Sequence, residues 1–436
     1  MKKVAFHTLG CKVNQYETQA MSELFEKAGY EVVSDSEIAD VYVINTCTVT
    51  NIGDKKSRQF IRRAKRNSPD SIIAVVGCYS QTASEEVAEI EGVNIVMGTS
   101  ERNKIVEYVE DCLPTGKINT VDDIMKVKDF EEMSVQEIKG KTRAVLKIQE
   151  GCNQYCSYCI IPYARGPIRS RRKHDIISEV ETLVNNGFKE VILTGIHVAS
   201  YGKDLNKNDA LLEVLREVND IDGLSRIRLS SLEPTLFTAD FLNGLSKLEK
   251  ICQHFHLSLQ SGSDKILQKM NRRYTTDEYR QIVKGIRKVY PDIALTTDII
   301  VGFPGESDDD FETTYLFVKE IEFSDIHVFK FSPRKGTPAA EFTQQVDGIK
   351  KHKRSEKLIE LGEKMKLHYL EQFIGREKEV LFETISKEYP DHVEGLTNNY
   401  IKVLLNSKKI HEGEIRKVTL QEIIGEYMVG SIINDN

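Results

Sequence analysis

Residues 150–166 read EGCNQYCSYCIIPYARG, and this short stretch decides how the larger part of the chain folds. It contains Cys152, Cys156 and Cys159 at C-x-x-x-C-x-x-C spacing, with no fourth cysteine close by. A 4Fe-4S cluster is ordinarily held by four cysteines. Three thiolates therefore leave one iron free for a small ligand, much as a catalytic zinc site keeps one position open. The spacing indicates an iron–sulfur centre that takes part in chemistry.

A structural zinc loop that borrows His174 is the alternative at this position. Zinc sites built from cysteine and histidine usually combine two short paired motifs. Residues 150–174 offer three cysteines without a second pair. On this spacing we favour iron over zinc.

The same cysteine loop resembles that of the radical S-adenosylmethionine (SAM) superfamily. The resemblance implies that the amino and carboxylate groups of SAM chelate the open iron. It also implies that an electron from the cluster splits SAM into methionine and a 5′-deoxyadenosyl radical. SAM and a 4Fe-4S cluster are therefore the expected cofactors, and the chain is expected to be an enzyme.

The size and composition of the chain indicate a multidomain globular protein. At 436 residues it exceeds the length at which one core stops growing, so two or three domains are expected. Residues 1–10 pass directly into a strand-like pattern without a signal peptide, and no stretch approaches the roughly 18 apolar residues of a membrane span. We expect a cytoplasmic protein with no membrane partner, whose eight cysteines are metal ligands or buried thiols.

Residues 1–114 alternate short apolar runs with longer amphipathic segments. Strand-like runs such as VAFHTLG, DVYVINT and SIIAVVG are separated by helix-like stretches, the first of them over residues 14–28. This alternation is typical of a doubly wound α/β fold with a parallel sheet. We predict a flavodoxin-like N-terminal domain with strand order 2-1-3-4-5.

Three of these strand-like runs end at a cysteine, namely Cys11, Cys47 and Cys78. They follow the first, third and fourth strands, which are neighbours in the predicted order, about 4.8 Å apart. Sheets of this kind bind ligands at the carboxyl ends of their strands, and each cysteine precedes a helix whose dipole favours a thiolate. One such cysteine would be an ordinary core residue, but three at matched positions predict a second metal site. Cys112 and Cys252 have no such partners, and we expect them in the core.

The order TLGCKVNQYET, INTC and VVGC, followed by the radical SAM loop, resembles the methylthiotransferase family over nearly the whole chain. In that family the N-terminal domain carries an auxiliary cluster. The resemblance implies two 4Fe-4S clusters and no catalytic residues beyond the cluster ligands. The ligands that it implies are Cys11, Cys47 and Cys78 for the auxiliary cluster, and Cys152, Cys156 and Cys159 for the SAM-cleaving cluster.

Residues 138–369 repeat strand and helix signals after an apparent linker over residues 113–139. The strand AVLKIQEG leads into the cysteine loop. The runs EVILTG, RIRLSSLEP, HFHLSLQSG, ALTTDIIVGFPGE and DIHVFKFSP follow, separated by amphipathic helices such as residues 176–186. This repetition predicts a TIM-like barrel, partial or full, with its active site at the carboxyl ends of the strands.

Polar residues follow these strands where a barrel enzyme places its site. The radical SAM resemblance implies that they surround SAM, with the turn at residues 194–195 near the methionine amine. It places the loop at residues 231–233 near the ribose and the glycine–proline loop at residues 302–305 near the adenine, with Tyr158 packed on that base. Each residue has the alternative role of capping a loop or forming a turn. The predicted SAM-binding residues are Tyr158, Thr194, Gly195, Ser231, Glu233, Gln260 and Asp298, with Glu306 after the same strand as Asp298.

Residues 370–434 carry short strand-like runs separated by turns, which predict a small antiparallel β-barrel. The phrases EGLTNNYIKV and EYMVGSI resemble a TRAM domain, and this resemblance implies RNA binding. The net charge of −7 excludes a uniformly basic surface, so contact with RNA requires local patches. Basic runs are usually solvated helix faces, but beside an RNA-binding module they are candidates for phosphate contact. They lie at residues 55–66, 165–173, 272–273 and 350–354.

The family resemblance implies a reaction that replaces C–H with C–SCH3, with sulfur from the auxiliary cluster and a methyl group from a second SAM. Relatives act on isopentenyladenosine in tRNA, on threonylcarbamoyladenosine in tRNA, or on an aspartate of a ribosomal protein. The opening HTLGCKVNQYET resembles the threonylcarbamoyladenosine branch, so we expect methylthiolation of that nucleoside next to the anticodon. The expected partners are the tRNA anticodon stem-loop and an electron donor of the flavodoxin or ferredoxin type. The alternatives are the other two substrates, or a non-enzymatic RNA-binding protein with iron–sulfur or zinc sites.

Overall fold

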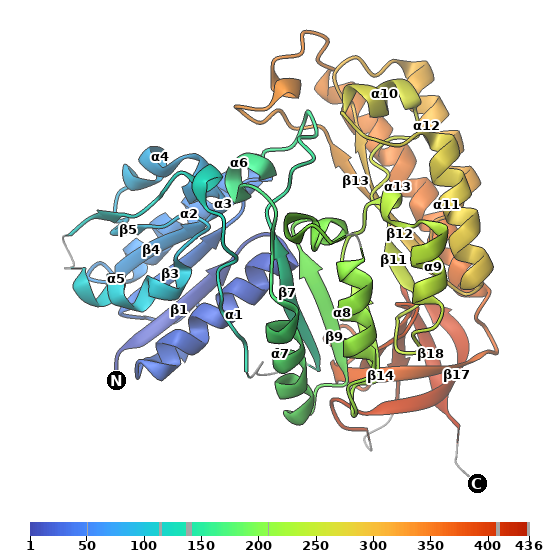
Figure 1. Cartoon of the computed structure of the whole chain (residues 1–436), viewed down its shortest axis with the longest axis horizontal. Coiled ribbons are helices and arrows are strands. Elements are labelled where there is room, and N and C mark those ends of the chain that lie inside the picture. The colour runs from blue at the N-terminus through green and yellow to red at the C-terminus, as the bar shows by residue number, and fades with distance from the viewer. Residues whose placement is uncertain (50, 113–115, 137–141, 208, 407–409, 434–436) are drawn as a thin grey trace.

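The computed structural model of the chain has three regions, and the central region contacts each of the other two (Figure 1). It describes residues 1–49, 51–112, 116–136, 142–207, 209–406 and 410–433. An N-terminal α/β region in blue and cyan lies beside a central region in green to orange, and a red β-barrel at the C-terminus lies below the latter. The expected domain boundaries at residues 114, 138 and 434 fall outside the described residues. Within those residues, no helix has the length and apolar character needed to cross a membrane.

In the described residues, the N-terminal region is built on a six-stranded parallel sheet with the order β2-β1-β3-β4-β5-β6. Its central strands are almost entirely apolar because helices cover both faces of the sheet. The order confirms the predicted flavodoxin-like fold, and the short β6 extends the sheet at one edge. The strands are β1 (Lys3–Thr8), β2 (Glu31–Val33), β3 (Val41–Thr46), β4 (Ile72–Gly77), β5 (Ile95–Val96) and β6 (Ile118–Asn119).

Helices pack against the two faces of this sheet and form a separate apolar core on each face. The first helix begins directly after Cys11, two residues earlier than predicted from the apolar pattern. Its buried positions recur at helical spacing, at Val13, Tyr16, Ala20 and Phe25 among others. The helices are α1 (Lys12–Lys27), α2 (Asn51–Asn67), α3 (Cys78–Thr82), α4 (Ser84–Ala88) and α5 (Ile105–Asp111).

The strands of the described central region curve into a partial barrel, and all of their pairings are parallel except that of the short β8 with β7. Hydrogen bonding divides them into two sheets, β10-β9-β7-β8 and β11-β12-β13, and the parallel bridges Ile227–Ile251 and Leu232–Leu257 connect the two. The prediction of a TIM-like barrel is therefore confirmed in its partial form. The strands are β7 (Arg143–Glu150), β8 (Arg169–Ser170), β9 (Glu190–Gly195), β10 (Arg226–Leu229), β11 (His254–His256), β12 (Ala294–Val301) and β13 (Asp325–Lys330).

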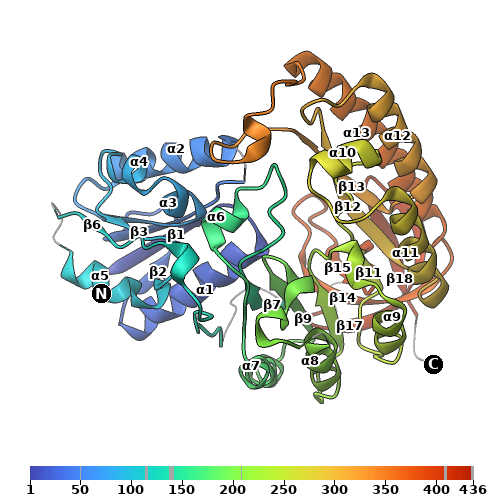
Figure 2. The same cartoon turned by 45° about the horizontal axis from the view of Figure 1, so that its top comes forward.

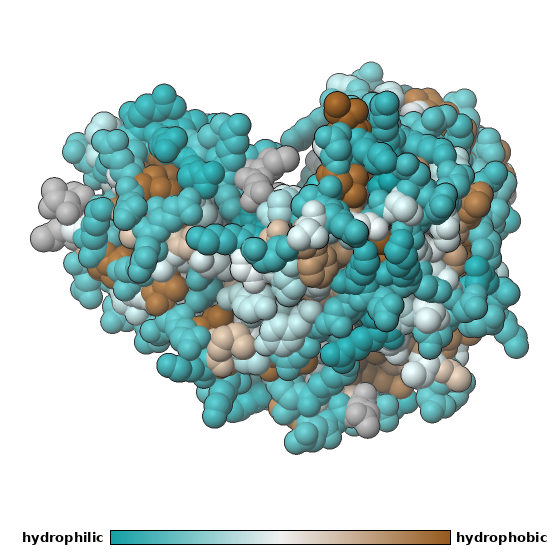
Figure 3. All heavy atoms as spheres, turned by 90° about the horizontal axis from the view of Figure 1, so that it is seen from above, coloured by the Kyte–Doolittle hydropathy of each residue, from teal (hydrophilic) through white to brown (hydrophobic). Residues whose placement is uncertain are grey.

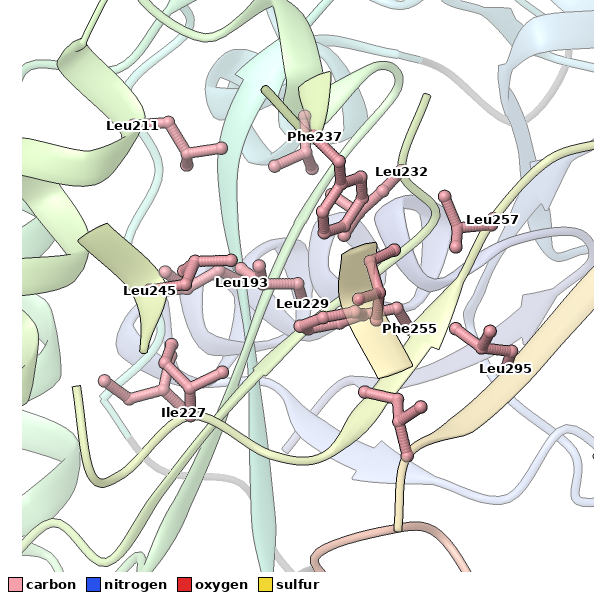
Figure 4. Close-up of a cluster of buried hydrophobic side chains, with 14 of the residues drawn as sticks. Leu193, Leu211, Ile227, Leu229, Leu232, Phe237, Leu245, Phe255, Leu257 and Leu295 are labelled. Carbon is pink, nitrogen blue, oxygen red and sulfur yellow. The ribbon is translucent and has the colours of Figure 1, made fainter. Parts of the chain in front are cut away.

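The outer helices of the partial barrel bury their apolar faces against these strands in the largest core of the described residues. Figure 4 shows part of this core, with Leu193, Leu229 and Phe255 from three neighbouring strands pointing toward one another. Capping boxes at Thr275 and Ser307 begin two of the helices. The helices are α6 (Ile161–Arg165), α7 (Lys173–Asn185), α8 (Ala210–Asn219), α9 (Ala239–Leu245), α10 (Asp264–Lys269), α11 (Thr276–Val289) and α12 (Asp308–Ile321).

The N-terminal helix α1 lies along the side of the partial barrel next to β7 (Figure 2). Tyr16 of α1 donates a hydrogen bond to the carbonyl oxygen of Met133 and contacts Glu179 of α7. Met133 and Val135 belong to the stretch that we expected to be a linker, yet both are buried. The described part of that stretch therefore fastens the N-terminal region to the barrel.

The long helix α13 (Gly348–Glu371) leads from the partial barrel into a closed C-terminal barrel with the order β14-β15-β16-β18-β17. The pairs are antiparallel except β16 with β18, which run parallel, so the expectation of an antiparallel barrel is wrong at this pair. Arg226 of β10 donates to the carbonyl oxygen of Leu396 (2.8 Å), which docks the two barrels. The strands are β14 (Glu377–Ile385), β15 (Val393–Thr397), β16 (Lys402–Leu405), β17 (Ile415–Ile424) and β18 (Tyr427–Ile432).

Candidate active site

A cavity of about 1000 Å³ lies where the three regions meet. Its lining comes from the loop after β1, the cysteine loop, several barrel strands, the end of α13 and the C-terminal barrel. Figure 3, which views the molecule from above, shows a largely hydrophilic surface with a notch between the N-terminal and central regions. Because every region supplies part of the lining, the site exists only in the assembled chain.

The cysteine loop is held in one shape by hydrogen bonds of its own backbone and by those of Ser157 to the backbone of Met270 and Ala339. The amide of Cys152 donates to the carbonyl oxygen of Gly166 (3.0 Å). Gly151 has a φ of +72°, and a Cβ there would lie 1.8 Å from the carbonyl oxygen of Pro167, so glycine is required. The thiols that this loop presents to the cavity are those of Cys152, Cys156 and Cys159.

The second set of predicted ligands also comes together. Cys11, Cys47 and Cys78 follow β1, β3 and β4, which are neighbours in the sheet. Gly10 packs closely on Cys47, since a Cβ at Gly10 would lie 2.9 Å from the Cys47 Cβ. The pKa of the Cys78 thiol is raised to about 12, first by burial and also by the nearby Cys47 and Cys11 thiols, against the lowering effect of Arg165. The three thiols therefore interact with one another, and Cys11 lines the cavity.

Neither cysteine triplet has the close spacing of a single-ion site. Among the described residues, the one group of three potential ligands whose donor atoms all lie within 4.8 Å of one another is His256, Asp298 and His327. A tetrahedral zinc about 2.3 Å from each sulfur would bring the sulfurs within about 4 Å of one another. Wider spacing fits a multi-iron cluster. His174, which the zinc alternative requires, is exposed and pairs with Asp175 at 2.9 Å.

A buried charge network joins the two cysteine triplets. Arg165, which ends the short helix after the cysteine loop, is fully buried. Its guanidinium donates to the Cys78 sulfur (3.1 Å), to Oδ1 of Asn14 (2.7 Å) and to Oε1 of Glu17 (2.6 Å). It also donates to Glu150 (3.1 Å), the residue before Gly151. One side chain thus links the auxiliary triplet, helix α1 and the strand that carries the other triplet.

Two further cations complete this network around Glu17. Lys147 of β7 lies 3.1 Å from Glu17, and Arg102 lies 2.6 Å from the other carboxylate oxygen. Burial by itself raises the pKa of Glu17, but Arg102, Arg165 and Lys147 outweigh it, so this pKa lies well below its usual value. Glu17 is therefore ionised, and its burial depends on all three cations.

Most of the predicted SAM-binding residues line the same cavity. The ring of Tyr158 makes an edge contact with Phe303 at 6.5 Å between centroids. The carboxylate of Asp298 lies 3.3 Å from Nε2 of His256. The predicted residues on the lining are Tyr158, Thr194, Gly195, Ser231 and Asp298.

Two predicted residues, Glu233 and Gln260, are not part of the lining. Glu233 accepts a hydrogen bond from Arg272 (2.8 Å), and Arg272 donates to the sulfur of Cys156 (3.4 Å). Gln260 adopts a left-handed backbone with φ +70°, and its amide donates to the carbonyl oxygen of Asp298 (2.8 Å). Both residues therefore support groups that do reach the cavity.

The glycine–proline loop at residues 302–305 also lies away from the cavity lining. Glu306 accepts a hydrogen bond from the amide of Gly302 (3.1 Å) and pairs with Arg354 (2.5 Å) in the interior. Burial raises the pKa of Glu306, although Arg354 opposes that shift. This side chain fixes the shape of the loop.

Histidines on the cavity lining were missed by the sequence reasoning. Nδ1 of His254 is buried without a hydrogen-bond partner among the described residues. Nε2 of His197 and of His256 have only long carboxylate contacts, at 3.5 and 3.3 Å. Buried nitrogen atoms that lack a short hydrogen bond fit a polar ligand such as SAM or a nucleoside. The signal was the His-Phe-His run of β11, because alternate residues of a strand share one face. The histidines of the lining are His197, His254, His256 and His327.

The expectation that the basic run at residues 165–173 faces RNA is wrong for three of its four arginines, whereas Arg172 is exposed. Arg165, Arg169 and Arg171 are all buried, and Arg171 pairs with Glu179 at 2.6 Å. Charge alone did not reveal this, because their carboxylate partners lie far away in the sequence. The run at residues 55–66 does present exposed cations on α2, namely Lys55, Lys56, Arg62, Arg63 and Arg66.

Known families and relatives match both halves of this site. Residues 3–98 match the uncharacterized protein family UPF0004, and residues 146–318 match the radical SAM superfamily. A relative from Bacillus subtilis (strain 168), named threonylcarbamoyladenosine tRNA methylthiotransferase MtaB, is 44% identical over 99% of this chain and 97% of its own length. The chain belongs to the radical SAM methylthiotransferase family. It is therefore an enzyme whose family uses a 4Fe-4S cluster and SAM.

Other methylthiotransferases of this family are similar over almost their full length. A protein from Aquifex aeolicus (strain VF5) with the same name as the Bacillus relative is 40% identical over 92% of this chain and 96% of its own. A tRNA-2-methylthio-N(6)-dimethylallyladenosine synthase from Clostridium tetani (strain Massachusetts / E88) is 37% identical over 96% and 95%. Family membership is thus shared by relatives with different named substrates.

A solved structure supports the fold independently. The radical SAM methyltransferase TsrM from Kitasatospora setae, determined with cobalamin and a 4Fe-4S cluster, superposes with a TM-score of 0.56. The superposition covers 78% of this chain and 77% of that one, at 16% sequence identity. At this identity the likeness concerns the fold.

Proposed function

We propose that this methylthiotransferase converts threonylcarbamoyladenosine next to the anticodon of tRNA into its 2-methylthio derivative. The observation that carries the proposal is the single cavity lined both by the cysteine loop of the partial barrel and by the Cys11 loop of the N-terminal region. The substrate follows the names of the relatives from Bacillus subtilis and Aquifex aeolicus. Isopentenyladenosine in tRNA, the substrate type named for the Clostridium tetani relative, is the second candidate.

Two clusters are part of this proposal. Cys152, Cys156 and Cys159 would hold the SAM-binding 4Fe-4S cluster, and the triplet Cys11, Cys47 and Cys78 would hold the auxiliary one. When bound, these groups and SAM supply the radical chemistry, the sulfur and the methyl group. The pKa values of the Cys78 and Cys159 thiols are raised, chiefly by burial. These thiols would bind iron as thiolates, so loading of the clusters would release their protons to solvent.

The protein's own residues would position the reactants and exclude water. Arg272 and Arg165 each donate to one cysteine sulfur, and a donated hydrogen bond stabilises a thiolate. Nε2 of His197 and Nδ1 of His254 have no hydrogen-bond partner among the described residues, so they can form hydrogen bonds with a ligand in the cavity. An adenosine of a stem-loop reaches such a cavity only when it is splayed out of its stack.

Two surfaces are candidates for contact with the anticodon stem-loop. The exposed cations of α2 lie on the helix that follows the Cys47 loop, and Asp54 in its first turn pairs with Arg334 from the partial barrel (2.7 Å). The C-terminal barrel, which we propose to be a TRAM domain, contributes residues 399–402 to the cavity lining. Cationic grooves beside a base-binding cavity are typical of RNA-modifying sites.

Two further proposals follow from the reaction. A flavodoxin- or ferredoxin-type donor would reduce the clusters. An enzyme that acts on tRNA would work in the cytoplasm.

The test is a reaction with anaerobically reconstituted enzyme, SAM, dithionite and tRNA that carries threonylcarbamoyladenosine. Mass spectrometry of the digested tRNA should detect the 2-methylthio derivative, and 5′-deoxyadenosine should accumulate. Conversion of isopentenyladenosine in its place would favour the second candidate. An absence of 5′-deoxyadenosine would favour a non-enzymatic iron–sulfur protein.

A further inference from the structure

Lys12 is the first residue of α1, directly after Cys11, and its side chain lines the cavity. It is partly buried. The groups that act most strongly on its charge are Tyr400, Arg228, Arg143 and Glu190, which belong to the two barrels. The Lys12 side chain therefore lies on the cavity lining, near groups of both barrels.

The other cationic side chains on the described lining all have carboxylate partners. Arg272 pairs with Glu233 (2.8 Å). Lys366 lies 3.2 Å from both Asp325 and Glu426, and Lys402 lies 2.6 Å from Glu426. Lys12 is different, since no described residue forms a hydrogen bond or an ion pair with it.

The carboxylate that acts most strongly on Lys12, that of Glu190, is already paired with other cations. Glu190 forms a close pair with Arg228 (2.7 Å) and lies 4.0 Å from Arg143. Among the charged groups that act most strongly on Lys12, two are cations, Arg228 and Arg143, and one is an anion, Glu190. A partly buried cation without a partner is costly, and an anionic ligand group that enters the cavity would remove that cost.

We propose that Lys12 binds the carboxylate of the threonyl group of the substrate nucleoside and so selects threonylcarbamoyladenosine over nucleosides with an uncharged side chain. This inference rests on the proposed function. The isopentenyl group of the rival substrate carries no charge, so it would leave Lys12 unpaired. The carboxylate of SAM is the other small anion of the reaction, and chelation of the open iron already occupies it in this superfamily. Backbone phosphates are the third source of negative charge.

Direct binding measurements on the reconstituted enzyme separate these sources. The ligands are three anticodon stem-loops that differ at one nucleoside: threonylcarbamoyladenosine, its methyl ester, and unmodified adenosine. The proteins are wild type, Lys12→Met, Lys12→Arg, and Lys27→Met as a control at the exposed far end of α1. Loss of a charge-assisted hydrogen bond costs about 10- to 100-fold in affinity.

The expected result is that Lys12→Met weakens binding of the carboxylate-bearing stem-loop about 10- to 100-fold and changes binding of the ester and of unmodified RNA less than about twofold. Lys12→Arg should retain most of the affinity, and Lys27→Met should match wild type. Iron content and the affinity for SAM should be unchanged in Lys12→Met.

Three results would overturn the assignment. Equal weakening for all three stem-loops would assign Lys12 to a phosphate, weaker SAM binding would assign it to the SAM carboxylate, and loss of iron would assign it to the neighbouring cluster. Failure of the wild type to methylthiolate any threonylcarbamoyladenosine stem-loop that it binds would instead overturn the proposed function. The two failures are therefore distinguishable.

Discussion

The two cysteine triplets lie beside the same cavity but are assembled in different ways. Cys152, Cys156 and Cys159 lie in one short loop. Gly151 and hydrogen bonds within residues 151–166 shape it, and Ser157 bonds it to the backbone of Met270 and Ala339. The other triplet comes from the ends of three separate strands and exists only when the N-terminal sheet has formed. The loop triplet is thus contiguous in the sequence, whereas the second triplet is assembled by the whole N-terminal sheet.

This difference indicates which substitutions should disrupt each cysteine site. The loop triplet depends on the partial barrel. The auxiliary triplet depends also on the contact of Arg165 with Glu17 and Cys78, which we call the seam between the partial barrel and the N-terminal region. Arg165 also donates to Glu150 beside the cysteine loop, so its loss should damage the auxiliary site more than the other. The predictions below test this asymmetry, from the largest expected effect to the smallest.

Loss of a loop ligand should abolish all chemistry. We expect Cys159→Ala to reduce formation of 5′-deoxyadenosine and of the methylthio product by more than about 1,000-fold, because SAM cleavage precedes every later step. Both products are measured by mass spectrometry. Cys112→Ala, at a buried position in the N-terminal core, is the matched control and should retain both activities. Persistent SAM cleavage in Cys159→Ala would contradict the assignment of the loop.

Loss of an auxiliary ligand should separate the two reactions. In Cys78→Ala we expect 5′-deoxyadenosine within about threefold of wild type and no methylthio product, with about four fewer iron atoms per chain. The physical reason is that the local loop does not need the N-terminal cluster to fold. If SAM cleavage falls as far as in Cys159→Ala, the two sites are not independent.

Removal of the seam arginine should destabilise the chain and loosen the auxiliary cluster. Arg165→Gln leaves the buried Glu17 and Glu150 without a cation, which costs about 3–5 kcal/mol. Denaturant unfolding under anaerobic conditions measures this change, and iron release on dilution should be faster for one cluster. The control is Arg416→Gln, whose exposed pair with Glu414 is worth less than about 1 kcal/mol. Equal effects of the two substitutions would contradict the claim that Arg165 stabilises the chain and the auxiliary cluster.

The seam should also respond to acid in a defined direction. Three cations hold the pKa of Glu17 well below its usual value of 4.5 despite its burial. Its contribution to stability is therefore fully present above about pH 4.5 and is lost as the pH falls toward the lower pKa of the folded state. We expect the difference in unfolding free energy between wild type and Glu17→Gln to shrink below pH 4.5. A difference that grows on acidification would reverse the sign and contradict the network.

The parts of the fold that repeat a local pattern could be predicted from the sequence. The strand–helix alternation gave the order of the N-terminal sheet, and the three-cysteine run indicated the loop site. Placement of Cys11, Cys47 and Cys78 could be inferred because topology fixes which strand ends are neighbours. These predictions needed only periodicity, spacing and the rules of parallel sheets.

What the sequence could not reveal depends on contacts between distant residues. Arg169 and Arg171 look like surface cations until Glu179 and backbone carbonyl groups are placed against them. Glu306 looks like a site residue, but its partner Arg354 lies on α13. The isolation of Lys12 is likewise a property of three regions together, because Glu190, the carboxylate that acts most strongly on it, is paired with Arg228.

The most direct test of the account is the iron content and Mössbauer spectrum of the enzyme labelled with 57Fe and purified without oxygen. The account predicts about eight iron atoms per chain in two 4Fe-4S clusters. It also predicts that about four remain, in one cluster, when Cys152, Cys156 and Cys159 are all replaced by alanine. About four iron atoms in the wild type, or none in the triple variant, would contradict two independent clusters.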